Sequence, residues 1–299
     1  MRTNILIIHN PTSGRSAAAT LDAVRARLRL RGCNVEIFTT TKPGDARTRA
    51  GQVRADETDI VAVAGGDGTI NEVVNGLGAD ADASAVPLGI IPLGTANVLA
   101  LELDLPKTPH ALADVIVDGP LAKTYPGRVG GPGGRLFVMM AGAGVDSRIV
   151  RGVSPRLKRM FGKGAYGVAG LREWVFLHKD QVEVEINGAV HRASSVIVAK
   201  GSRFAGPFVI APDARLAEPQ FWVCLINWQG RWGVLRIALG LLLGTFSGMV
   251  GVNIIKTPAL CIRGPKGLAL QLDGDDMGNV PVTMDIAENP VYMATGRRA

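Results

Sequence analysis

The stretch IVAVAGGDGT, residues 60–69, decides how the first part of this chain folds. The uninterrupted apolar run Ile60–Ala64 is typical of a strand that is buried on both faces of a parallel sheet. Two glycines and an aspartate follow at once, and a helix is expected over Thr69–Leu77. These residues therefore predict a strand, a tight glycine turn and a helix, in that order.

The flanking segments repeat this alternation of strand and helix. Further elements are expected, in chain order, at Ile5–Ile8 (strand), Ala17–Leu30 (helix), Val35–Phe38 (strand), Asp45–Ala55 (helix) and Leu88–Ile91 (strand). Because such alternation is typical of a parallel sheet with helices on both faces, residues 1–123 are predicted to form an α/β domain. In such sheets, ligands bind at the loops that leave the carboxyl ends of the strands.

The pattern changes after residue 123 and becomes rich in strands. Apolar runs that predict strands lie at Leu136–Ala141, Val182–Ile186, Ser195–Ala199, Phe221–Ile226, Ala259–Arg263 and Leu268–Leu272. Two helices are expected among them, at Tyr166–Leu177 and Gly233–Leu243. Strands without regular intervening helices predict an antiparallel, sandwich-like second domain.

The composition indicates folded domains and an acidic partner. The chain has 299 residues, 47% of them hydrophobic, and a formal net charge of +7. This charge suits nucleotide phosphates or an anionic membrane, and the few aromatic residues argue against a nucleic-acid partner. The cysteines Cys33, Cys224 and Cys261 lie far apart in the sequence and are expected to be free thiols in a cytoplasmic protein.

One long apolar stretch, Val234–Ile255, needs its own interpretation. It carries a single charge, Arg236, and its length approaches the ~20 residues that a membrane-spanning helix requires. Its glycines and polar residues favour a different structure, a buried helix that runs into a strand.

The GGDGT turn has the features of a phosphate-binding loop. Adjacent glycines let backbone N–H groups approach a phosphate, and the N-terminus of the next helix adds donors and a favourable dipole. Asp67 would repel a phosphate unless a cation lay between them, which indicates Mg²⁺ or a water network. The structural alternative is a glycine turn that opens a helix, with Thr69 and Glu72 as a capping box.

Two further loops leave predicted strands with similar residues. Residues 10–14, NPTSG, follow the first strand, and residues 92–97, PLGTAN, follow the fourth. Either loop is a weak signal alone, since Asn-Pro also marks ordinary turns. Three polar loops at three strand ends of one sheet are expected to converge on one ligand. Neither GxxxxGK[ST] nor GxGxxG occurs, so P-loop and Rossmann chemistry are not indicated.

An acidic turn near the C-terminus points to catalysis. Residues 271–276, QLDGDD, close an apolar strand. Asp-Gly is a strong hairpin signal, so a plain turn is the structural alternative. The functional interpretation is a general base, a carboxylate that accepts the proton of an attacking hydroxyl.

Together, the motifs NPTSG, GGDGT, PLGTAN and QLDGD resemble the diacylglycerol kinase catalytic-domain family. That family includes bacterial soluble diacylglycerol kinases, lipid kinases of the YegS type, and sphingosine and ceramide kinases. Other segments that match it are Gly44-Asp45-Ala46, Gly142–Asp146, Lys158, Ala165-Tyr166 and Ala211–Ala214. GGDGT also occurs in NAD kinases, so the pairing of PLGTAN with QLDGD is the more specific signal.

The resemblance implies domains and site residues. It implies a phosphofructokinase-like nucleotide-binding α/β domain at 1–123, rejoined by residues 284–299, and a β-sandwich-rich lipid-substrate domain at 124–283. Asp67 would serve a catalytic Mg²⁺, and Asp273 would be the general base, with Asp275 as a second catalytic carboxylate. ATP would contact Asn10, Pro11, Thr12, Ser13, Gly14, Thr40, Gly65, Gly66, Asp67, Gly68, Thr69, Asn71 and Thr95.

The chain departs from the family pattern at two places. Asp275 stands where the family usually has Glu, one methylene longer, and catalytic placement is sensitive at that scale. The family's PDA-x-L-x-DG segment binds a structural Mg²⁺, and here Glu218-Pro219 replaces the Asp-Gly. Pro219 removes a backbone donor, while Glu218 and the carbonyls of Arg215 and Gln220 are expected to complete a second metal site.

The predicted reaction is in-line transfer of the γ-phosphoryl group of ATP to a hydroxyl of a diacylglycerol-like membrane lipid, held in a cleft between the domains. The enzyme is expected to be cytoplasmic and peripherally attached to the inner face of the membrane. A basic run with one aromatic residue is expected to contact anionic headgroups, or else to be a solvated face: Arg151, Arg156, Lys158, Arg159, Phe161 and Lys163. The identity of the lipid and the oligomeric state, with a homodimer as one option, are left open.

Two other functions fit part of the sequence. An NAD kinase shares GGDGT but lacks the PLGTAN-to-QLDGD arrangement. A catalytically weak nucleotide-sensing or lipid-binding protein is kept open by Asp275 and by Glu218-Pro219.

Overall fold

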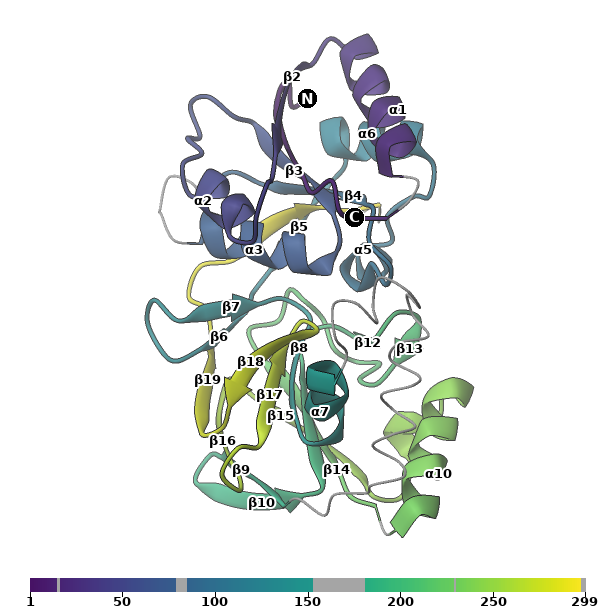
Figure 1. Cartoon of the computed structure of the whole chain (residues 1–299), viewed down its shortest axis with the longest axis vertical. Coiled ribbons are helices and arrows are strands. Elements are labelled where there is room, and N and C mark those ends of the chain that lie inside the picture. Colours follow the sequence, from purple (N-terminus) through teal and green to yellow (C-terminus); the bar gives the residue numbers. More distant parts are fainter. Residues whose placement is uncertain (15–16, 79–84, 153–180, 229, 297–299) are drawn as a thin grey trace. The chain divides into compact units, whose positions relative to one another are not determined.

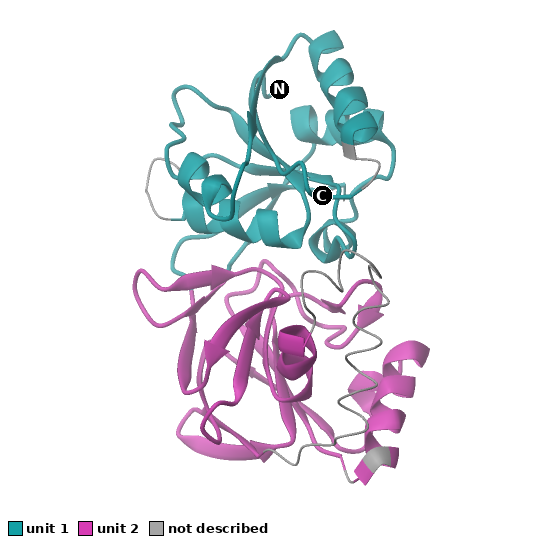
Figure 2. Ribbon diagram, in the orientation of Figure 1, with its two compact units in different colours: residues 1–126, 287–299 teal, residues 127–286 magenta. Residues whose placement is uncertain are grey.

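The computed structural model describes residues 1–14, 17–78, 85–152, 181–228 and 230–296. The chain divides into two compact units, unit 1 (residues 1–126 and 287–299) and unit 2 (residues 127–286), drawn in Figure 2. The boundaries expected from the sequence lie at 123 and 284. Each unit is described below by itself.

Unit 1 is built on a mostly parallel sheet with the strand order β2-β1-β3-β4-β20-β5 in the described residues. Its strands are β1 (Asn4–His9), β2 (Asn34–Thr39), β3 (Ile60–Gly65), β4 (Leu88–Pro92), β5 (Leu121–Thr124) and β20 (Val291–Ala294). Every residue of β3 is buried, as its continuous apolar run predicts. The end of the chain completes this sheet, because β20 pairs parallel with β4 and antiparallel with β5.

Helices cover both faces of this sheet (Figure 1). α1 (Ala17–Leu30) and α6 (Pro109–Asp118) pack on one face and share a core with β1 and β3. α2 (Asp45–Ala50) and α3 (Asp67–Leu77) lie on the other. A Cβ at Gly76 would lie 2.7 Å from the Cβ of Ala50, so these two helices touch closely. The α/β class of the first domain is therefore confirmed.

Two features of unit 1 differ from the sequence expectation. α2 ends at Ala50 rather than at Ala55, because the N–H of Gly51 caps the helix by donating to backbone carbonyls. α5 (Val98–Glu102) and α6 were not predicted. The start of α6 has a readable signal, since Thr108 accepts from the N–H of Ala111 at the N-cap and Pro109 follows it.

In the described residues, unit 2 carries two six-stranded sheets, with the orders β10-β9-β16-β19-β6-β7 and β15-β14-β11-β8-β17-β18. The first contains β6 (Gly127–Val129), β7 (Arg135–Phe137), β9 (Val182–Ile186), β10 (Ala189–Ala193), β16 (Ala259–Arg263) and β19 (Val282–Ile286). The second contains β8 (Met140–Ala143), β11 (Ser195–Ala199), β14 (Phe221–Ile226), β15 (Val252–Thr257), β17 (Ala269–Leu272) and β18 (Asp275–Asn279). β12 (Arg203–Phe204) and β13 (Phe208–Val209) form a small ribbon.

The core of unit 2 draws apolar side chains from both sheets. Val184 and Ile262 come from one sheet and Val196 and Val223 from the other, all fully buried in one cluster. The strand pairs are antiparallel, so the predicted β-sandwich is confirmed. In the part of unit 2 that the structure describes, two helices accompany the sheets, α7 (Val145–Gly152) and α10 (Gly230–Leu243), the second followed by a short 3₁₀ turn at Phe246–Gly248.

The apolar stretch 234–255 forms a helix and a strand, as expected, but the helix is not buried. α10 buries Ile237 and Gly240, whereas Trp232, Leu242 and Leu243 are exposed. The prediction of a buried helix was wrong because hydropathy records how apolar a segment is and not which neighbours cover it. No helix among the described residues is long and apolar enough to cross a membrane. The helix expected at Tyr166–Leu177 lies outside the described residues.

Candidate active site

The NPTSG loop of unit 1 is tied to the GGDGT turn through Asn10. The amide Nδ2 of Asn10 donates to Thr69 Oγ1 at 3.0 Å, and its backbone N–H donates to the carbonyl of Ala64. The same side chain accepts the N–H and hydroxyl of Thr12 at 3.0 and 2.8 Å, which fixes the turn. Asn10 therefore shapes this loop and joins it to the end of β3.

The GGDGT turn and the PLGTAN loop touch through their glycines. A Cβ at Gly94 would lie 2.5 Å from the Cα of Gly66, so glycine is required where the two backbones meet. The N–H of Leu93 donates to the carbonyl of Gly65 at 2.9 Å, and a Cβ at Gly14 would lie 2.6 Å from the carbonyl oxygen of Leu93. These contacts bring together the three loops that leave β1, β3 and β4.

Asp67 links the same two loops through its carboxylate. Its two oxygens accept the N–H groups of Val98 and Leu99, at 3.2 and 3.3 Å, where α5 begins. Burial raises the pKa of Asp67 above its ordinary value, although these backbone donors act in the opposite direction. The carboxylate thus holds the residues that follow the PLGTAN loop against the GGDGT turn.

Glu72 and Thr40 both make hydrogen bonds near the end of β2. Glu72 does not form the capping box that was considered, because its Oε2 accepts the N–H of Gly44, at 3.1 Å, in the turn after β2. Thr40 is nearly buried and donates its N–H to the carbonyl of His9, so it lies beside the end of β1. Asn71 is buried within α3, where its side chain accepts from Asn75. Thr95 is exposed.

In unit 2, Asp273 and Gly274 form the two-residue turn between β17 and β18. Both have positive φ angles, 48° and 87°, as the hairpin signal of Asp-Gly predicts. The carboxylate of Asp273 accepts three backbone N–H groups, from Val138 at 2.7 Å and from Met139 and Met140 at 2.9 Å. Three such donors hold the side chain in one orientation and favour its ionised form.

The next two carboxylates of this hairpin pair with arginines. Asp275 is exposed and lies 3.8 Å from the guanidinium of Arg135. Asp276 accepts two hydrogen bonds from Arg151 of α7, at 2.8 and 2.9 Å. Asp276 therefore anchors the hairpin to α7, while Asp275 extends toward solvent.

Asp146 is connected to the Asp273-Gly274 turn through Gln271, a role that the sequence did not reveal. Gln271 Nε2 donates to Asp146 at 3.2 Å, and Gln271 Oε1 accepts the N–H of Gly274 at 2.9 Å. Burial raises the pKa of Asp146 to about 6, although donors such as Gln271 and Ser195 act to lower it. A chain of hydrogen bonds thus runs from α7 to the residue beside Asp273. The only sequence signal was the family match at 142–146.

The loop expected to hold a second metal ion is occupied by cations of the protein itself. Lys200 is fully buried, and its Nζ donates to the carbonyls of Glu218 and Gln220 at 2.6 and 2.9 Å. The carbonyl of Arg215 accepts the N–H of Glu218. A Mg²⁺ bound to the same carbonyls would stand roughly 4 Å from the ammonium, where the charges repel by about 8 kcal/mol at an effective dielectric constant of ~20. The residues present do not fit a metal ion, so the expectation of a site at Arg215, Glu218 and Gln220 is corrected.

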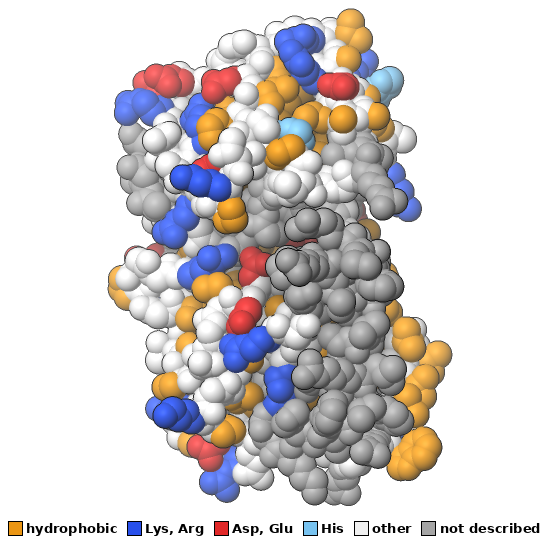
Figure 3. Space-filling model, in the orientation of Figure 1, with side chains coloured by type: hydrophobic (Ala, Val, Ile, Leu, Met, Phe, Trp, Pro, Cys, Tyr) orange, Lys and Arg blue, Asp and Glu red, His pale blue; other side chains and the backbone are white. Residues whose placement is uncertain are grey.

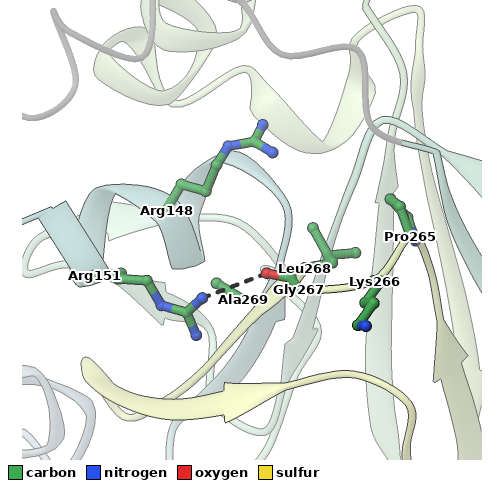
Figure 4. Close-up of a pocket in the computed structure, with 7 residues that line it drawn as sticks. All are labelled: Arg148, Arg151, Pro265, Lys266, Gly267, Leu268 and Ala269. Carbon is green, nitrogen blue, oxygen red and sulfur yellow. Dashed lines mark hydrogen bonds between the residues drawn. The ribbon is translucent and has the colours of Figure 1, made fainter.

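Two other candidate features add no ligand. Among the described residues, no group of three or more His, Cys, Asp or Glu side chains could hold a metal. A pocket of 290 Å³ beside α7 (Figure 4) is lined by Arg148, Arg151, Pro265, Lys266, Gly267, Leu268 and Ala269. The guanidinium of Arg151 is already paired with Asp276 there. Of the basic run predicted to contact lipid, only Arg151 lies within the described residues.

Family models match both units of the chain. The diacylglycerol kinase catalytic domain matches residues 4–129, and the YegS C-terminal NAD kinase beta sandwich-like domain matches residues 139–294. A diacylglycerol kinase of Bacillus subtilis is 31% identical over 279 residues, covering 92% of this chain and 90% of that protein. A diacylglycerol kinase of Staphylococcus saprophyticus is 28% identical over 284 residues, covering 94% and 92%.

Solved structures share the fold. A diacylglycerol kinase structure from Bacillus anthracis superimposes with a TM-score of 0.73 at 18% identity, covering 99% of this chain and 97% of that one. A second structure from the same organism gives a TM-score of 0.81 at 20% identity, covering 99% and 98%. At these identities the likeness concerns the fold alone.

Proposed function

The chain belongs to the diacylglycerol kinase catalytic-domain family, and from that premise we propose that it is an ATP-dependent lipid kinase acting on a diacylglycerol-like hydroxyl. The observation that carries the proposal is the junction of three polar, glycine-containing loops at the ends of β1, β3 and β4. Exposed Thr12 and Thr95 beside those loops supply hydroxyl donors that suit a nucleotide.

The phosphates of ATP bind, in this proposal, against the Gly65–Thr69 turn and the N-terminus of α3. Backbone N–H groups at a helix N-terminus favour an anion, and the residues after Gly66 are the first of an eleven-residue helix. Asp67 is the residue suited to Mg²⁺, because it is the carboxylate at the start of α3, beside the glycine turn. When bound, the ion neutralises phosphate oxygens. The chain's own contribution is to hold the three loops in register through Asn10 and Asp67.

Asp273 is the proposed general base for the lipid hydroxyl. Three backbone donors hold its carboxylate in one orientation, from which it accepts the proton in this proposal. Asp275, exposed next to it, is proposed as the second catalytic carboxylate. The attacking oxygen forms its bond to the γ-phosphorus as the bond to the β-phosphate oxygen breaks, and the hydroxyl proton passes to Asp273.

One incubation tests the whole proposal. The purified chain is mixed with ATP labelled at the γ-phosphate, Mg²⁺ and a total lipid extract, and the labelled products are separated and identified. A labelled lipid phosphate is the expected result. Labelled NADP from added NAD would instead assign an NAD kinase, and no labelled product would assign a binding protein. The expected location, at the cytoplasmic face of a membrane, belongs to the same proposal and is tested separately, by fractionating cells that produce the chain.

A further inference from the structure

A buried lysine lies where the sequence led us to expect a metal ion. Lys200 follows β11, is 0% exposed, and points its ammonium at the carbonyls of Glu218 and Gln220. A fully buried lysine is rare unless its charge is satisfied. Both carbonyls accept hydrogen bonds from the ammonium, and both belong to one loop. Pro219 lies between them in the sequence and has no backbone N–H to donate.

A second cation serves the beginning of the same loop. The Nη1 of Arg215 donates to the carbonyls of Pro212 and Ala214 at 2.8 and 2.9 Å. Four carbonyls between residues 212 and 220 thus accept from two positive side chains of the chain itself. A divalent ion organises a loop in the same way, by gathering oxygens around one positive charge.

We propose that the Lys200 ammonium takes the place of a structural metal ion in the 211–220 loop, so that this loop is ordered without any divalent cation. The replacement accounts for two sequence departures together. The Asp-Gly of the family pattern is no longer required at 218 and 219, where this chain has Glu-Pro, and the positive charge now comes from residue 200.

Thermal unfolding of the full chain without nucleotide tests this proposal. The Tm of the wild type is expected to be equal in excess EDTA and in millimolar MgCl₂. Lys200→Met removes the ammonium from both carbonyls, of which that of Glu218 keeps the N–H of Gln220, and is expected to lower Tm by roughly 5 °C or more. Lys266→Met, at an exposed lysine of the same unit, is the control and should leave Tm unchanged.

A third variant tests whether the loop can bind Mg²⁺ once the lysine is removed. Lys200→Ala vacates the cation position, so MgCl₂ is expected to recover part of its lost Tm. A wild-type Tm that falls in EDTA, or a Lys200→Met protein as stable as the wild type, would overturn the proposal. The wild-type comparison stands even where the variants do not fold.

A separate observation concerns α10, which exposes a row of large apolar side chains. Trp232, Leu235, Leu239, Leu242 and Leu243 are 39–81% exposed and recur every three or four residues, which places them along one side of the helix. Ile237 and Gly240 on the other side are buried. Figure 3 shows hydrophobic side chains gathered where Figure 1 draws α10. An apolar row of this size on a described surface indicates an interaction site.

The charges of the sequence segment that contains this helix indicate what covers it, although Arg263 of that segment is paired with Glu185. Residues 219–272 contain no Asp or Glu and include the basic residues Arg231, Arg236, Lys256, Arg263 and Lys266. Arg236 also holds the exposed Val250 near the helix by donating to its carbonyl. A helix with tryptophan and leucines on one side, in a segment that is purely basic, matches the boundary of a bilayer with anionic lipids.

We infer that α10 docks the protein on an anionic membrane by inserting this row into the interface, an inference that rests on the proposed lipid substrate. The test is co-sedimentation with vesicles of phosphatidylcholine, with or without phosphatidylglycerol. The wild type is expected to sediment with the anionic vesicles, and Leu239→Ser/Leu242→Ser to bind them at least tenfold more weakly. Leu30→Ser, at an 83% exposed leucine of α1, is the matched control and should bind like the wild type.

Activity on a short-chain, water-soluble diacylglycerol separates this inference from the proposed function. The double variant should phosphorylate it at the wild-type rate, because no vesicle is involved. If the wild type phosphorylates this substrate but does not bind vesicles, the docking surface is overturned and the proposed function stands. If it binds vesicles but does not phosphorylate the substrate, the proposed function is overturned and the docking surface stands. A dimer that the double variant abolishes, with no vesicle binding, would assign the row to a second copy of the chain and so overturn the inference.

Discussion

Replacing Asp273 with Asn tests the proposed base at a known structural cost. The amide oxygen of Asn can keep the bonds from Met139 and Met140, but its NH₂ group would face the N–H of Val138 across 2.7 Å. One hydrogen bond is lost and one buried donor is left unpaired, which costs about 1–3 kcal/mol. At ~2–4 °C per kcal/mol, Tm should fall by roughly 2–12 °C.

The catalytic loss should be much larger than this structural cost. Removing a general base lowers kcat by ~10²–10⁴. ATP binding should stay within about threefold of the wild type, because the proposed nucleotide site lies in unit 1 and Asp273 in unit 2. The assays are phosphorylation of a lipid substrate well below the variant's Tm and ATP binding by calorimetry.

Asp276→Asn is the matched control within the same hairpin. It weakens a bidentate pair with Arg151 in which both side chains are more than a third exposed, so it should cost under about 1 kcal/mol and leave kcat within a few fold. A kcat for Asp273→Asn above a tenth of the wild-type value would refute the assignment of the base. So would an equal loss of activity in Asp276→Asn, since the effect would then belong to the hairpin as a whole.

Three further predictions concern the surroundings of the two site regions. Because burial raises the pKa of Asp146 from 3.8 to about 6, the folded chain binds the proton more tightly, so stability should fall as pH rises from about 4 to about 6; Asp146→Asn should flatten this part of a Tm–pH curve. Gly142→Ala would place its Cβ against the Asp146 carboxylate and should cost about 2 kcal/mol or more in urea unfolding, whereas Gly248→Ala, with open space around it, should be near neutral. Asn10→Ala removes the bond to Thr69 and should raise the KM for ATP by about fivefold or more with a smaller change in kcat, and an unchanged KM would contradict its role in the nucleotide site.

Local sequence patterns were sufficient where burial and turn chemistry act within a few residues. The bounds of β9, β11, β14 and β16 are those expected, because β11 and β14 are short runs buried throughout and β9 and β16 alternate buried and less buried residues, and both patterns are typical of strands. The Asp273-Gly274 turn was also legible, since few residue pairs accept two successive positive φ angles. β10 and β18 were missed because most of their residues are exposed, and β19 because only one of its five residues is buried; all three are strands through their partners.

The contacts of the site were less predictable than its residues. The sequence singled out Asp67 and Asp273 but not the groups that donate to them. Asp67 accepts from the N-terminus of α5, 31 residues away, and Asp273 accepts from three N–H groups more than 130 residues away. Lys200 went unnoticed because a lysine at a strand end is ordinarily solvated. Only the tertiary structure closes the core over it and brings the 218–220 carbonyls within reach.

The position of β20 has a consequence for how the chain is made. Unit 1 brackets unit 2, and the N–H of Ala287 donates to the carbonyl of Pro126 where the chain leaves and re-enters unit 1. Among the described strands, the one between β4 and β5 is therefore the last to be synthesised. A nascent chain stopped before residue 291 would have translated all of unit 2 and still leave the edge of β4 open to pairing with other chains. Termination just before residue 291 should therefore yield aggregating protein.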